Sequence, residues 1–546
     1  MRAIDAQARI LKLEGVEYLF CFPHSPLIDA AAKIEIRPIV TRTERTMLNM
    51  ADGYSRVTNG RRLGVATVQA GPGVENVYPG VAQAFSDSVP LLLLPGHPGR
   101  SRADFPPTYE ARPHYRGVTK WCAQINAARR VPEMMRRAFS LLRTGRPGPV
   151  LLEMPGDVAE EELSESEFHY VPPQRVRSAG DPADIQRVAA ALVEARCPLL
   201  HAGHGVLWAE ATPELIELAE LLQAPVVTTL AGKSAFPENH PLSVGTAAYT
   251  GTEASDHFLK KADLVFGIGA SFSRAVLSTP IPPGKVMIQA TIDELDLHKD
   301  YPLDHAIIGD AKLVLAQLVA AVQDRLGPQG PRADRSVAGE IERVKSDWLR
   351  RWMPKLTSNE VPINPYRVVW DLMHAIDRKN AIVLHDSGNP RDQVVPFYEA
   401  IIPRGYLGWG KSTQLGTSLG LAMGAKLAAP EKLVVHVIGD AGLGMCGMDL
   451  ETAVRERIPI LTILLNNSAM GNYEQYMPIA TERYRTKYLS GAYAKVAEGL
   501  GASSERVEKP ADIVPAIKRA QEANLGGRPT LLEIITREEP AFSKYW

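Results

Sequence analysis

The sequence predicts an α/β protein built from three doubly wound domains with parallel β-sheets. First, 546 residues exceed what a single hydrophobic core usually contains. Second, short apolar runs alternate with helical stretches along the chain, which is typical of parallel sheets with crossover helices. Third, two stretches rich in Pro, Gly, Ser and charge, at 171–184 and 326–336, interrupt this alternation and indicate linkers. We therefore predict domains at residues 1–170, 184–325 and 360–546.

Buried strands are expected wherever a short apolar run is bounded by turn residues. These runs are Arg62–Val68, Val89–Leu94, Pro149–Met154, Pro198–His201, Leu264–Ile268, Leu433–Ile438 and Ile458–Leu465. A weak repeat also connects the outer segments, because Gly145–Met154 and Gly527–Ile535 both begin Gly-Arg-Pro and continue into an apolar run. Either the first and third domains are copies of one fold, or two strands with similar starts coincide by chance.

The composition restricts the classes of partner. The chain is 45% hydrophobic with a formal net charge of -1, and it has neither a long block of like charge nor an apolar run of about 20 residues. We therefore expect no nucleic acid and no membrane, and look for partners among small molecules and like subunits. The N-terminus lacks the apolar core of a signal peptide, so we expect a cytoplasmic protein. Four isolated cysteines indicate neither a disulfide framework nor a zinc site.

The strongest functional signal is in the third segment, at the ends of two apolar runs. The run 433–438 is followed by Gly439, Asp440, Ala441 and Gly442. A carboxylate and glycines at the end of a buried strand are typical of phosphate binding in open α/β sheets. The run 458–465 ends in Asn466 and Asn467, and positions 440 and 467 are separated by an interval of 27 residues, one strand-helix-strand unit. Both side chains are thus expected at one sheet edge, where hard oxygen ligands suit Mg²⁺ bridging a diphosphate.

These residues resemble a known signature. Gly439-Asp440, the 27-residue interval and Asn466-Asn467 are similar to the thiamine-diphosphate motif of the acetolactate synthase, benzaldehyde lyase and 2-hydroxyacyl-CoA lyase group, and the resemblance extends over nearly the whole chain. It implies that thiamine diphosphate and Mg²⁺ are the cofactors. It also implies that the metal ligands are Asp440, Asn467 and the backbone carbonyl of Ala469, and that Met470 and Gly471 line the cofactor site.

The first segment contains a candidate for the activating carboxylate. Residues 41–47, followed by Ala-Asp-Gly-Tyr at 51–54, resemble the family's stretch that carries a catalytic glutamate, here Glu44. In the family this glutamate hydrogen-bonds the cofactor's aminopyrimidine and favours the tautomer that deprotonates the thiazolium carbon. It faces the Asp440 site of another subunit, which implies a homodimer or homotetramer. Taken alone, Glu44 would be a solvated glutamate at a helix start.

Two further segments resemble cofactor contacts. Val68–Asn76 is similar to the family's Gly-Pro-Gly loop, which implies that Gly71, Gly73 and Asn76 lie beside the cofactor. Leu415, between Gln414 and Gly416, aligns with the position whose apolar side chain supports the bent cofactor. A leucine in that context is also compatible with an ordinary core position.

The sequence signals for residues that face the substrate are less specific than those for the cofactor. His24 and Ser25 occupy the loop where acetolactate synthase has Pro-Gly-Gly, and Gln69 stands where related decarboxylases have a polar or histidine residue. Glu474 follows the second metal ligand and is a candidate base for a substrate hydroxyl. The alternatives are that His24 is an exposed loop residue and Glu474 a glutamate on a helix surface.

The middle segment resembles the central domain of acetolactate synthase, with one departure. Where synthases that bind FAD usually have Arg-Phe-Asp-Asp-Arg, this chain has Ser271-Phe272-Ser273-Arg274. The departure counts against FAD and against acetolactate synthesis. The preferred hypothesis is therefore a thiamine-diphosphate-dependent carbon-carbon lyase or decarboxylase similar to 2-hydroxyacyl-CoA lyase. Its substrate would be a 2-keto acid or a 2-hydroxyacyl compound that carries, or lacks, CoA. The alternative is acetolactate synthase, a 2-keto acid carboligase.

Two other hypotheses need to be considered. Gly405–Ser412 satisfies the P-loop pattern of an NTPase, although a P-loop should follow a buried strand and open a helix. A non-catalytic relative would keep the fold as a scaffold, but it would have no need for Glu44. Neither hypothesis explains Glu44, Asp440 and Asn467 together.

Overall fold

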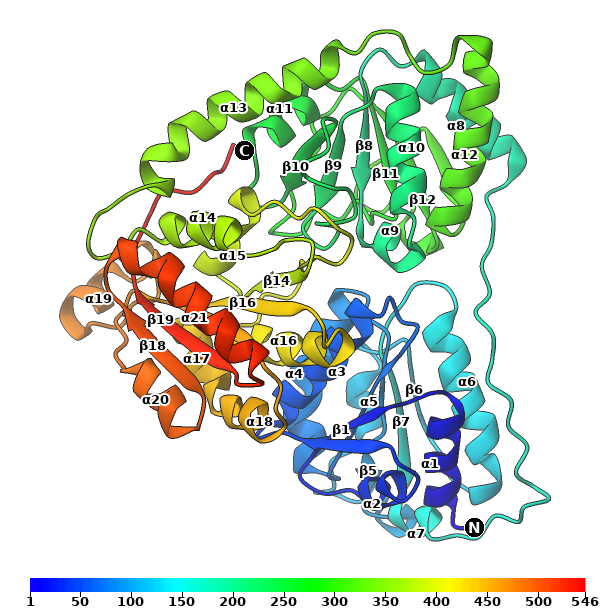
Figure 1. Ribbon diagram of the computed structural model, residues 1–546. Helices are drawn as coiled ribbons and strands as arrows, with labels where there is room; N and C mark the ends of the chain where they lie inside the picture. Colours follow the sequence, from blue (N-terminus) through cyan, green and yellow to red (C-terminus); the bar gives the residue numbers. More distant parts are fainter. Residues whose placement is uncertain (546) are drawn as a thin grey trace.

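The computed structural model contains three parallel β-sheets, each flanked by helices (Figure 1). It describes residues 1–545; Trp546, the last residue of the predicted third domain, lies outside the described residues, as does the side chain of Gln329. In Figure 1 the first sheet (blue to cyan) lies below, the central sheet (green) above, and the third (yellow to red) beside them. All three sheets fall inside the predicted segments, while the exact domain boundaries stay predictions.

The first sheet has seven strands in the order β2-β1-β3-β4-β7-β5, with β6 also paired to β7, and every pair is parallel. Near-continuous apolar strands such as β3 are buried along their whole length, as expected for a sheet covered on both faces. The elements are α1 (Ala3–Leu13), β1 (Tyr18–Phe22), α2 (Pro26–Ala32), β2 (Arg37–Val40), α3 (Glu44–Val57), β3 (Gly64–Val68), α4 (Pro72–Ser86), β4 (Leu91–Leu93), β5 (Gly96–His97), η1 (Arg100–Arg102), α5 (Ala111–Tyr115), β6 (Trp121–Gln124), η2 (Ala128–Arg130), α6 (Val131–Arg143), β7 (Val150–Pro155) and α7 (Gly156–Ala159).

The central sheet has six parallel strands in the order β10-β9-β8-β11-β12-β13. Strand order reverses between β8 and β11, which is where doubly wound sheets open a crevice at their carboxyl edge. The elements are α8 (Pro182–Glu194), β8 (Pro198–Ala202), α9 (His204–Ala209), α10 (Thr212–Leu222), β9 (Val226–Thr229), β10 (Ser243–Ala247), α11 (Glu253–Lys261), β11 (Leu264–Ile268), β12 (Val286–Thr291), η3 (Glu294–Asp296), β13 (His305–Ile308), α12 (Ala311–Leu326) and η4 (Gly327–Gln329).

The third sheet has six parallel strands in the order β15-β14-β16-β17-β19-β18, and the long helix α13 (Ser336–Leu356) leads into it. The remaining elements are α14 (Pro365–Ala375), β14 (Ala381–His385), α15 (Asn389–Phe397), β15 (Tyr406–Leu407), α16 (Ser418–Ala428), β16 (Leu433–Gly439), α17 (Asp440–Cys446), η5 (Gly447–Asp449), α18 (Leu450–Arg455), β17 (Leu461–Asn466), η6 (Tyr473–Gln475), α19 (Pro478–Tyr484), α20 (Tyr493–Gly499), β18 (Ser503–Val507), η7 (Pro510–Asp512), α21 (Ile513–Leu525) and β19 (Thr530–Ile535).

The first and third sheets share one topology. Without the short β5, both have the strand order 2-1-3-4-6-5 when the strands of each domain are numbered along the chain. The repeat found in the sequence corresponds to β7 and β19, which occupy equivalent places in the two sheets. The interpretation of the outer domains as copies of one fold is thereby confirmed.

Helices α3 and α16 join the first and third domains within one chain. A Cβ added at Gly53 would lie 2.2 Å from the carbonyl oxygen of Leu421, and one added at Gly424 would lie 2.0 Å from that of Met50. The helix backbones approach so closely that only glycine fits at these points. This contact fixes α3, which begins at Glu44, against the third domain.

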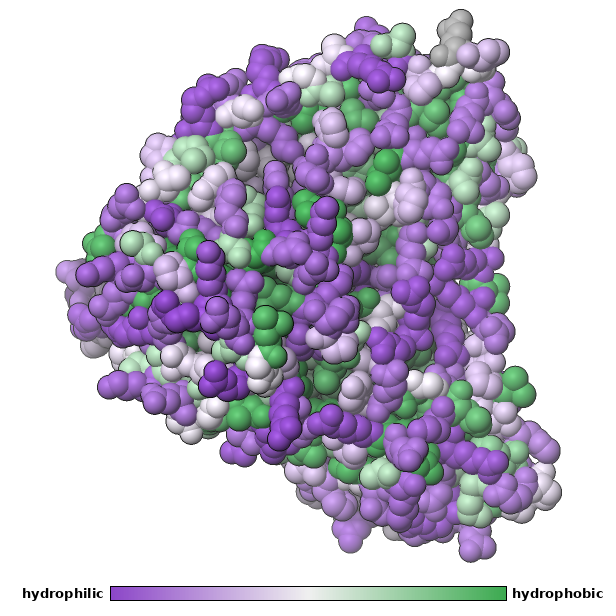
Figure 2. Space-filling view, in the orientation of Figure 1, coloured by the Kyte–Doolittle hydropathy of each residue, from purple (hydrophilic) through white to green (hydrophobic). Residues whose placement is uncertain are grey.

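The surface is that of a globular protein. Figure 2 shows that hydrophilic residues cover most of the visible face, with apolar residues scattered among them. None of the helices described for residues 1–545 is long and apolar enough to cross a membrane. All four cysteines are free thiols; Cys21 and Cys446 are buried, and Cys122 and Cys197 are partly buried.

Candidate active site

Asp440 is the first residue of α17 and follows the end of β16. Its side chain is buried, at 3% exposure, and Oδ1 accepts a hydrogen bond from the Ala441 amide at 2.8 Å. The other oxygen, Oδ2, is buried and has no hydrogen-bond partner among the described residues. Burial raises the pKa of this carboxyl, and nearby backbone N–H groups oppose the increase. A buried carboxylate oxygen without a partner fits a bound cation.

Asn467 lies at the same sheet edge, because β16 and β17 pair with Gly439 opposite Leu465. Its Oδ1 accepts a hydrogen bond from the Ala469 amide at 3.1 Å. The preceding Asn466 donates to the buried carboxylate of Glu533 on β19 at 2.8 Å, which anchors the turn. Carboxylate, amide and carbonyl oxygens form a donor set that suits Mg²⁺. The structure thus brings the predicted ligands Asp440, Asn467 and Ala469 to one edge.

The segment after Asn467 is folded back over this edge. The Met470 amide donates to the carbonyl of Lys487 at 2.8 Å. Gly471 approaches Asn389 so closely that a Cβ would lie 2.1 Å from Asn389 Nδ2. Glu474 is 63% exposed and forms a 2.7 Å ion pair with Lys487. The predicted base is therefore a surface residue that already has a cationic partner, and its catalytic role stays a prediction.

Glu44 is the first residue of α3, whose N-cap Thr43 accepts a hydrogen bond from the Thr46 amide. The Glu44 side chain is buried, at 7% exposure, and accepts a hydrogen bond from Asn76 Nδ2 at 3.4 Å. Two predicted cofactor residues are thus in contact. Asp449 of the third domain accepts from the Arg42 amide at 2.7 Å, which fixes the turn before α3. Among the hydrogen bonds of residues 1–545, none joins Glu44 to Asp440.

The predicted substrate-facing residues occupy the carboxyl edge of the first sheet, where β1 and β3 run side by side. His24 and Gln69 are exposed there. Ser25, by contrast, is buried and caps α2, because its hydroxyl accepts from the Leu27 amide at 3.3 Å and from Thr67 Oγ1 at 3.0 Å. These contacts explain Ser25 as a structural residue.

The Gly-Pro-Gly loop opens α4. Gly71 has φ +69°, a conformation that favours glycine, and open space surrounds the position of its missing Cβ. Gly73 is tighter, with a Cβ position 3.2 Å from Val68 Cβ. Close approach of a ligand to this loop is therefore sterically possible.

Leu415 is partly buried in the loop before α16. The next residue, Gly416, has φ +77°, and its missing Cβ would lie 3.1 Å from the carbonyl oxygen of Gly442 on α17. The predicted apolar support therefore lies beside the helix that begins at Asp440.

The P-loop hypothesis is wrong for Gly405–Ser412. Strand β15 lies inside the motif instead of before it, and α16 begins only at Ser418. Trp409 is fully buried, with its indole N–H donating to the His385 carbonyl at 2.7 Å. Lys411 reaches Ser271 of the central domain instead of facing a phosphate cradle. The pattern match reflects composition alone.

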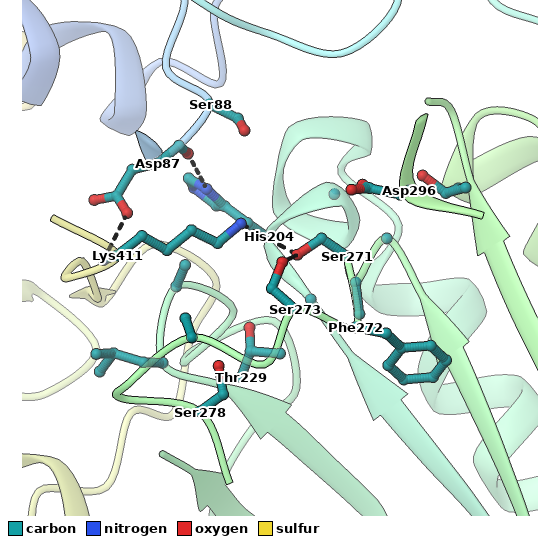
Figure 3. Close-up of a pocket in the computed structure, with 18 of the residues that line it drawn as sticks. Asp87, Ser88, His204, Thr229, Ser271, Phe272, Ser273, Ser278, Asp296 and Lys411 are labelled. Atoms are coloured by element: carbon teal, nitrogen blue, oxygen red, sulfur yellow. Dashed lines mark hydrogen bonds between the residues drawn. The ribbon is translucent and has the colours of Figure 1, made fainter. Parts of the chain in front are cut away.

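A crevice of about 160 Å³ lies at the switch point of the central sheet, between all three domains (Figure 3). Figure 3 shows Lys411 extending to Ser271 at 3.1 Å, and His204 against the backbone carbonyl of Asp87 at 3.3 Å. Arg146 spans another side through ion pairs with Asp293 and Asp296. The volume is below the range of about 300–1,000 Å³ usual for ligand pockets.

Three residues with evident structural roles at the site were not predicted. Glu533 anchors the Asn466 turn, Asn389 supports Gly471, and Asp386 holds the loop of Leu415. Only Asp386 had a sequence signal, since it ends the apolar run 381–385 much as Asp440 ends β16. The contacts of Glu533 and Asn389 depend on which segments the fold places side by side, which the sequence does not reveal.

The comparisons with known proteins agree with this arrangement. Models of thiamine pyrophosphate enzymes match the chain in three parts: the N-terminal TPP binding domain at residues 1–126, the central domain at 185–318 and the C-terminal TPP binding domain at 386–534. Together with the paired topology of the outer domains, these matches define a thiamine-pyrophosphate-dependent enzyme.

Full-length relatives narrow the class. A probable acetolactate synthase large subunit of Methanocaldococcus jannaschii is 31% identical, covering 98% of this chain and 92% of the relative. The acetolactate synthase isozyme 3 large subunit of Escherichia coli is 27% identical, covering 95% of this chain and 92% of the relative. A glyoxylate carboligase of Escherichia coli O157:H7 is 29% identical, covering 98% of this chain and 93% of the relative. The chain belongs to the acetolactate synthase family of thiamine-pyrophosphate-dependent enzymes.

Proposed function

We propose that the chain is a carboligase that joins two 2-keto acids, with acetolactate formation from pyruvate as its leading candidate reaction. The observation that carries the proposal is the 31% identity to an acetolactate synthase large subunit over 98% of the chain. The relatives reported above are named synthases and a carboligase. They favour the synthase alternative over the lyase similar to 2-hydroxyacyl-CoA lyase that the sequence alone suggested.

We assign the metal site to Asp440 Oδ2, Asn467 and the carbonyl of Ala469. The unpartnered, buried Oδ2 supports this assignment because a cation there removes an unpaired polar atom. We assign contacts with the diphosphate of thiamine pyrophosphate to the backbone of residues 439–442, at the start of α17, and to Gly471. When bound, this cofactor supplies a carbon nucleophile and an electron sink next to the substrate carbonyl.

We assign to Glu44 the hydrogen bond that holds a proton at the pyrimidine ring nitrogen of the cofactor. Its burial and its contact with Asn76 support a fixed carboxylate with restricted access to water. We assign to His24 and Gln69 the orientation of the substrate carboxylate, and their exposure just beyond the ends of neighbouring strands supports this role. The ion pair of Glu474 with Lys487 favours a role in holding the 470–488 segment over proton transfer.

We infer that the working unit is at least a homodimer. Support comes from a set of exposed large apolar side chains on α17 and in residues 448–484 of the third domain, since exposed apolar side chains that gather on one face mark interaction sites. These residues are Met445, Met448, Tyr473, Tyr476, Ile479 and Tyr484. We infer that a second copy covers this set and contributes its own Glu44 to the Asp440 site.

The test is a product assay with purified protein, Mg²⁺ and thiamine pyrophosphate. Incubation with pyruvate should release one CO₂ for every two pyruvates and yield acetolactate; glyoxylate and 2-hydroxyacyl-CoA thioesters serve as competing substrates. We propose no FAD, so the purified protein should lack the visible absorbance of a flavin. Cleavage of a 2-hydroxyacyl-CoA thioester without any ligation of 2-keto acids would overturn the proposed function.

A further inference from the structure

The segment that carries Leu415 is unusually well anchored for a loop. We call residues 408–417, between β15 and α16, the Leu415 loop. Buried carboxylates from different domains bind its two ends. The guanidinium of the residue that follows Glu44 binds the carbonyl of Leu415. We propose that Asp386, together with Arg45, is a positioning residue that sets where Leu415 meets the cofactor. This inference rests on the proposed function, because Leu415 is assigned there by resemblance.

Asp386 holds the C-terminal end of the loop. It follows β14 directly and is fully buried, at 0% exposure. Oδ1 accepts from the Gly416 amide at 2.9 Å and Oδ2 accepts from the Ser418 amide at 2.9 Å. Both oxygens are therefore committed to the backbone on either side of residue 417. A buried carboxylate with two backbone donors fixes position more strictly than an apolar contact does.

Asp87 of the first domain holds the other end. Its carboxylate accepts from the Lys411 amide at 3.2 Å and from the Gly410 amide at 3.4 Å, the former visible in Figure 3. Asp87 is itself held by Arg56 at 3.1 Å and by Gln83 at 2.7 Å. The loop is thus suspended between two domains.

The carbonyl of Leu415 contacts the helix that begins at Glu44. Arg45, the next residue of α3, donates from its guanidinium to the Leu415 carbonyl and, at 3.5 Å, to Thr417 Oγ1. Gln414 donates to the Pro79 carbonyl at 2.8 Å on the same side. One turn of α3 therefore presents Glu44 to its proposed ligand and fixes the backbone of Leu415 of the same chain.

Asp386 also lies against the proposed diphosphate helix. The missing Cβ of Gly442 would be 2.9 Å from Asp386 Oδ1, and that of Gly416 would be 2.9 Å from Met445 Cβ. One carboxylate thus separates and aligns the Leu415 loop and α17, whose first residue is Asp440. Shifting this carboxylate should move Leu415 relative to the metal site.

The experiment is a double-mutant cycle with two readouts, kcat for pyruvate and the calorimetric Kd for thiamine pyrophosphate with Mg²⁺. Asp386→Asn replaces one acceptor with a donor that faces a backbone N–H. We expect it to lower kcat at least tenfold with KM within threefold, and to weaken cofactor binding. In a Leu415→Ala background the same change should alter either readout by less than threefold, because Asp386 acts through Leu415.

The matched control is Asp310→Asn, a buried helix cap in the central domain whose carboxylate accepts from the Lys312 amide at 3.1 Å. It should leave both readouts within twofold. If D386N does not fold, Arg45→Met takes its place in the cycle, because it removes only the hydrogen bonds of Arg45 to the Leu415 carbonyl and Thr417. Effects that multiply across the cycle in both readouts would overturn the inference. Absence of carboligation in the wild type would overturn only the proposed function, since the binding cycle still reports on Asp386.

Discussion

Replacement of Gly53 by alanine should loosen the contact between α3 and α16. The added Cβ would lie 2.2 Å from the Leu421 carbonyl oxygen and 2.9 Å from the Leu421 Cα. Normal C···O contacts are about 3.3 Å or longer, so the two helices must separate by about 1 Å. Overpacking costs about 1–3 kcal/mol, and we expect the upper half of this range, about 2–3 kcal/mol, because the backbone of Leu421 cannot rotate away as a side chain can. Alanine regains about 1 kcal/mol of helix propensity, so we expect a net loss of about 1–2 kcal/mol.

Urea unfolding at fixed protein concentration measures this loss, and kcat should fall with it, because α3 begins at Glu44 and α16 follows the Leu415 loop. Gly339→Ala is the matched control, since Gly339 lies in α13 with no atom within 4 Å of its Cβ position. That substitution should stabilise the protein by about 0.5–1 kcal/mol. A Gly53→Ala protein as stable as wild type would show that the close helix contact does not exist in solution.

Three further outcomes follow from the site and the core. Glu44→Gln should reduce turnover at least a hundredfold while the calorimetric Kd for thiamine pyrophosphate stays within about threefold, because the carboxylate activates the cofactor more than it holds it; full activity would contradict its role. Asp440→Ala should abolish the Mg²⁺ dependence of cofactor binding, whereas Asp449→Asn, at the turn before α3, should retain it; Mg²⁺-dependent binding by Asp440→Ala would move the metal elsewhere. His436, held by Ser418 Oγ at 3.2 Å and Thr462 Oγ1 at 2.7 Å, has a pKa lowered to about 3 by burial. Its folded form stays neutral while the unfolded chain binds a proton, so stability is lost as the pH falls below about 6.5, amounting to about 2 kcal/mol at pH 5. In urea unfolding, His436→Gln should lose about 2 kcal/mol less free energy of unfolding than wild type between pH 7 and pH 5. His374→Gln, at an exposed position, should lose as much as wild type.

Much of the fold was predictable because its strands are buried on both faces. Runs such as Leu264–Ile268 and Leu433–Ile438 match β11 and β16 closely, since parallel strands covered by helices are apolar at every position. Strand β18 (Ser503–Val507) was missed because it lies at a sheet edge and is mostly polar and partly exposed. The pairing order of the strands was also not predicted, because it depends on contacts between distant segments.

The candidate site was predictable where chemistry coincides with a strand end, as at Asp440 and Asn467. Asp386 and Glu533 were not predicted because each binds a segment distant in the sequence: Asp386 binds the loop before α16, and Glu533 binds the side chain of Asn466 on β17. Ser25 was predicted to face substrate, but its hydroxyl caps a helix, a role that a single sequence position does not distinguish. The departure of Ser271–Arg274 from the flavin motif favours the lyase, whereas similarity over the full length of the chain favours the synthase.

We propose that Glu44 and Asp440 of different subunits serve one cofactor. Mixing two inactive proteins, Glu44→Gln and Asp440→Ala, under conditions that exchange subunits tests it directly. In a mixed dimer one site would combine both intact residues, so carboligase activity should reappear and approach about a quarter of the wild-type value at equal amounts. No recovered activity, with subunit exchange verified, would contradict a site shared between subunits. Glu44 and Asp440 would then act within one chain, and neither protein contains both residues intact.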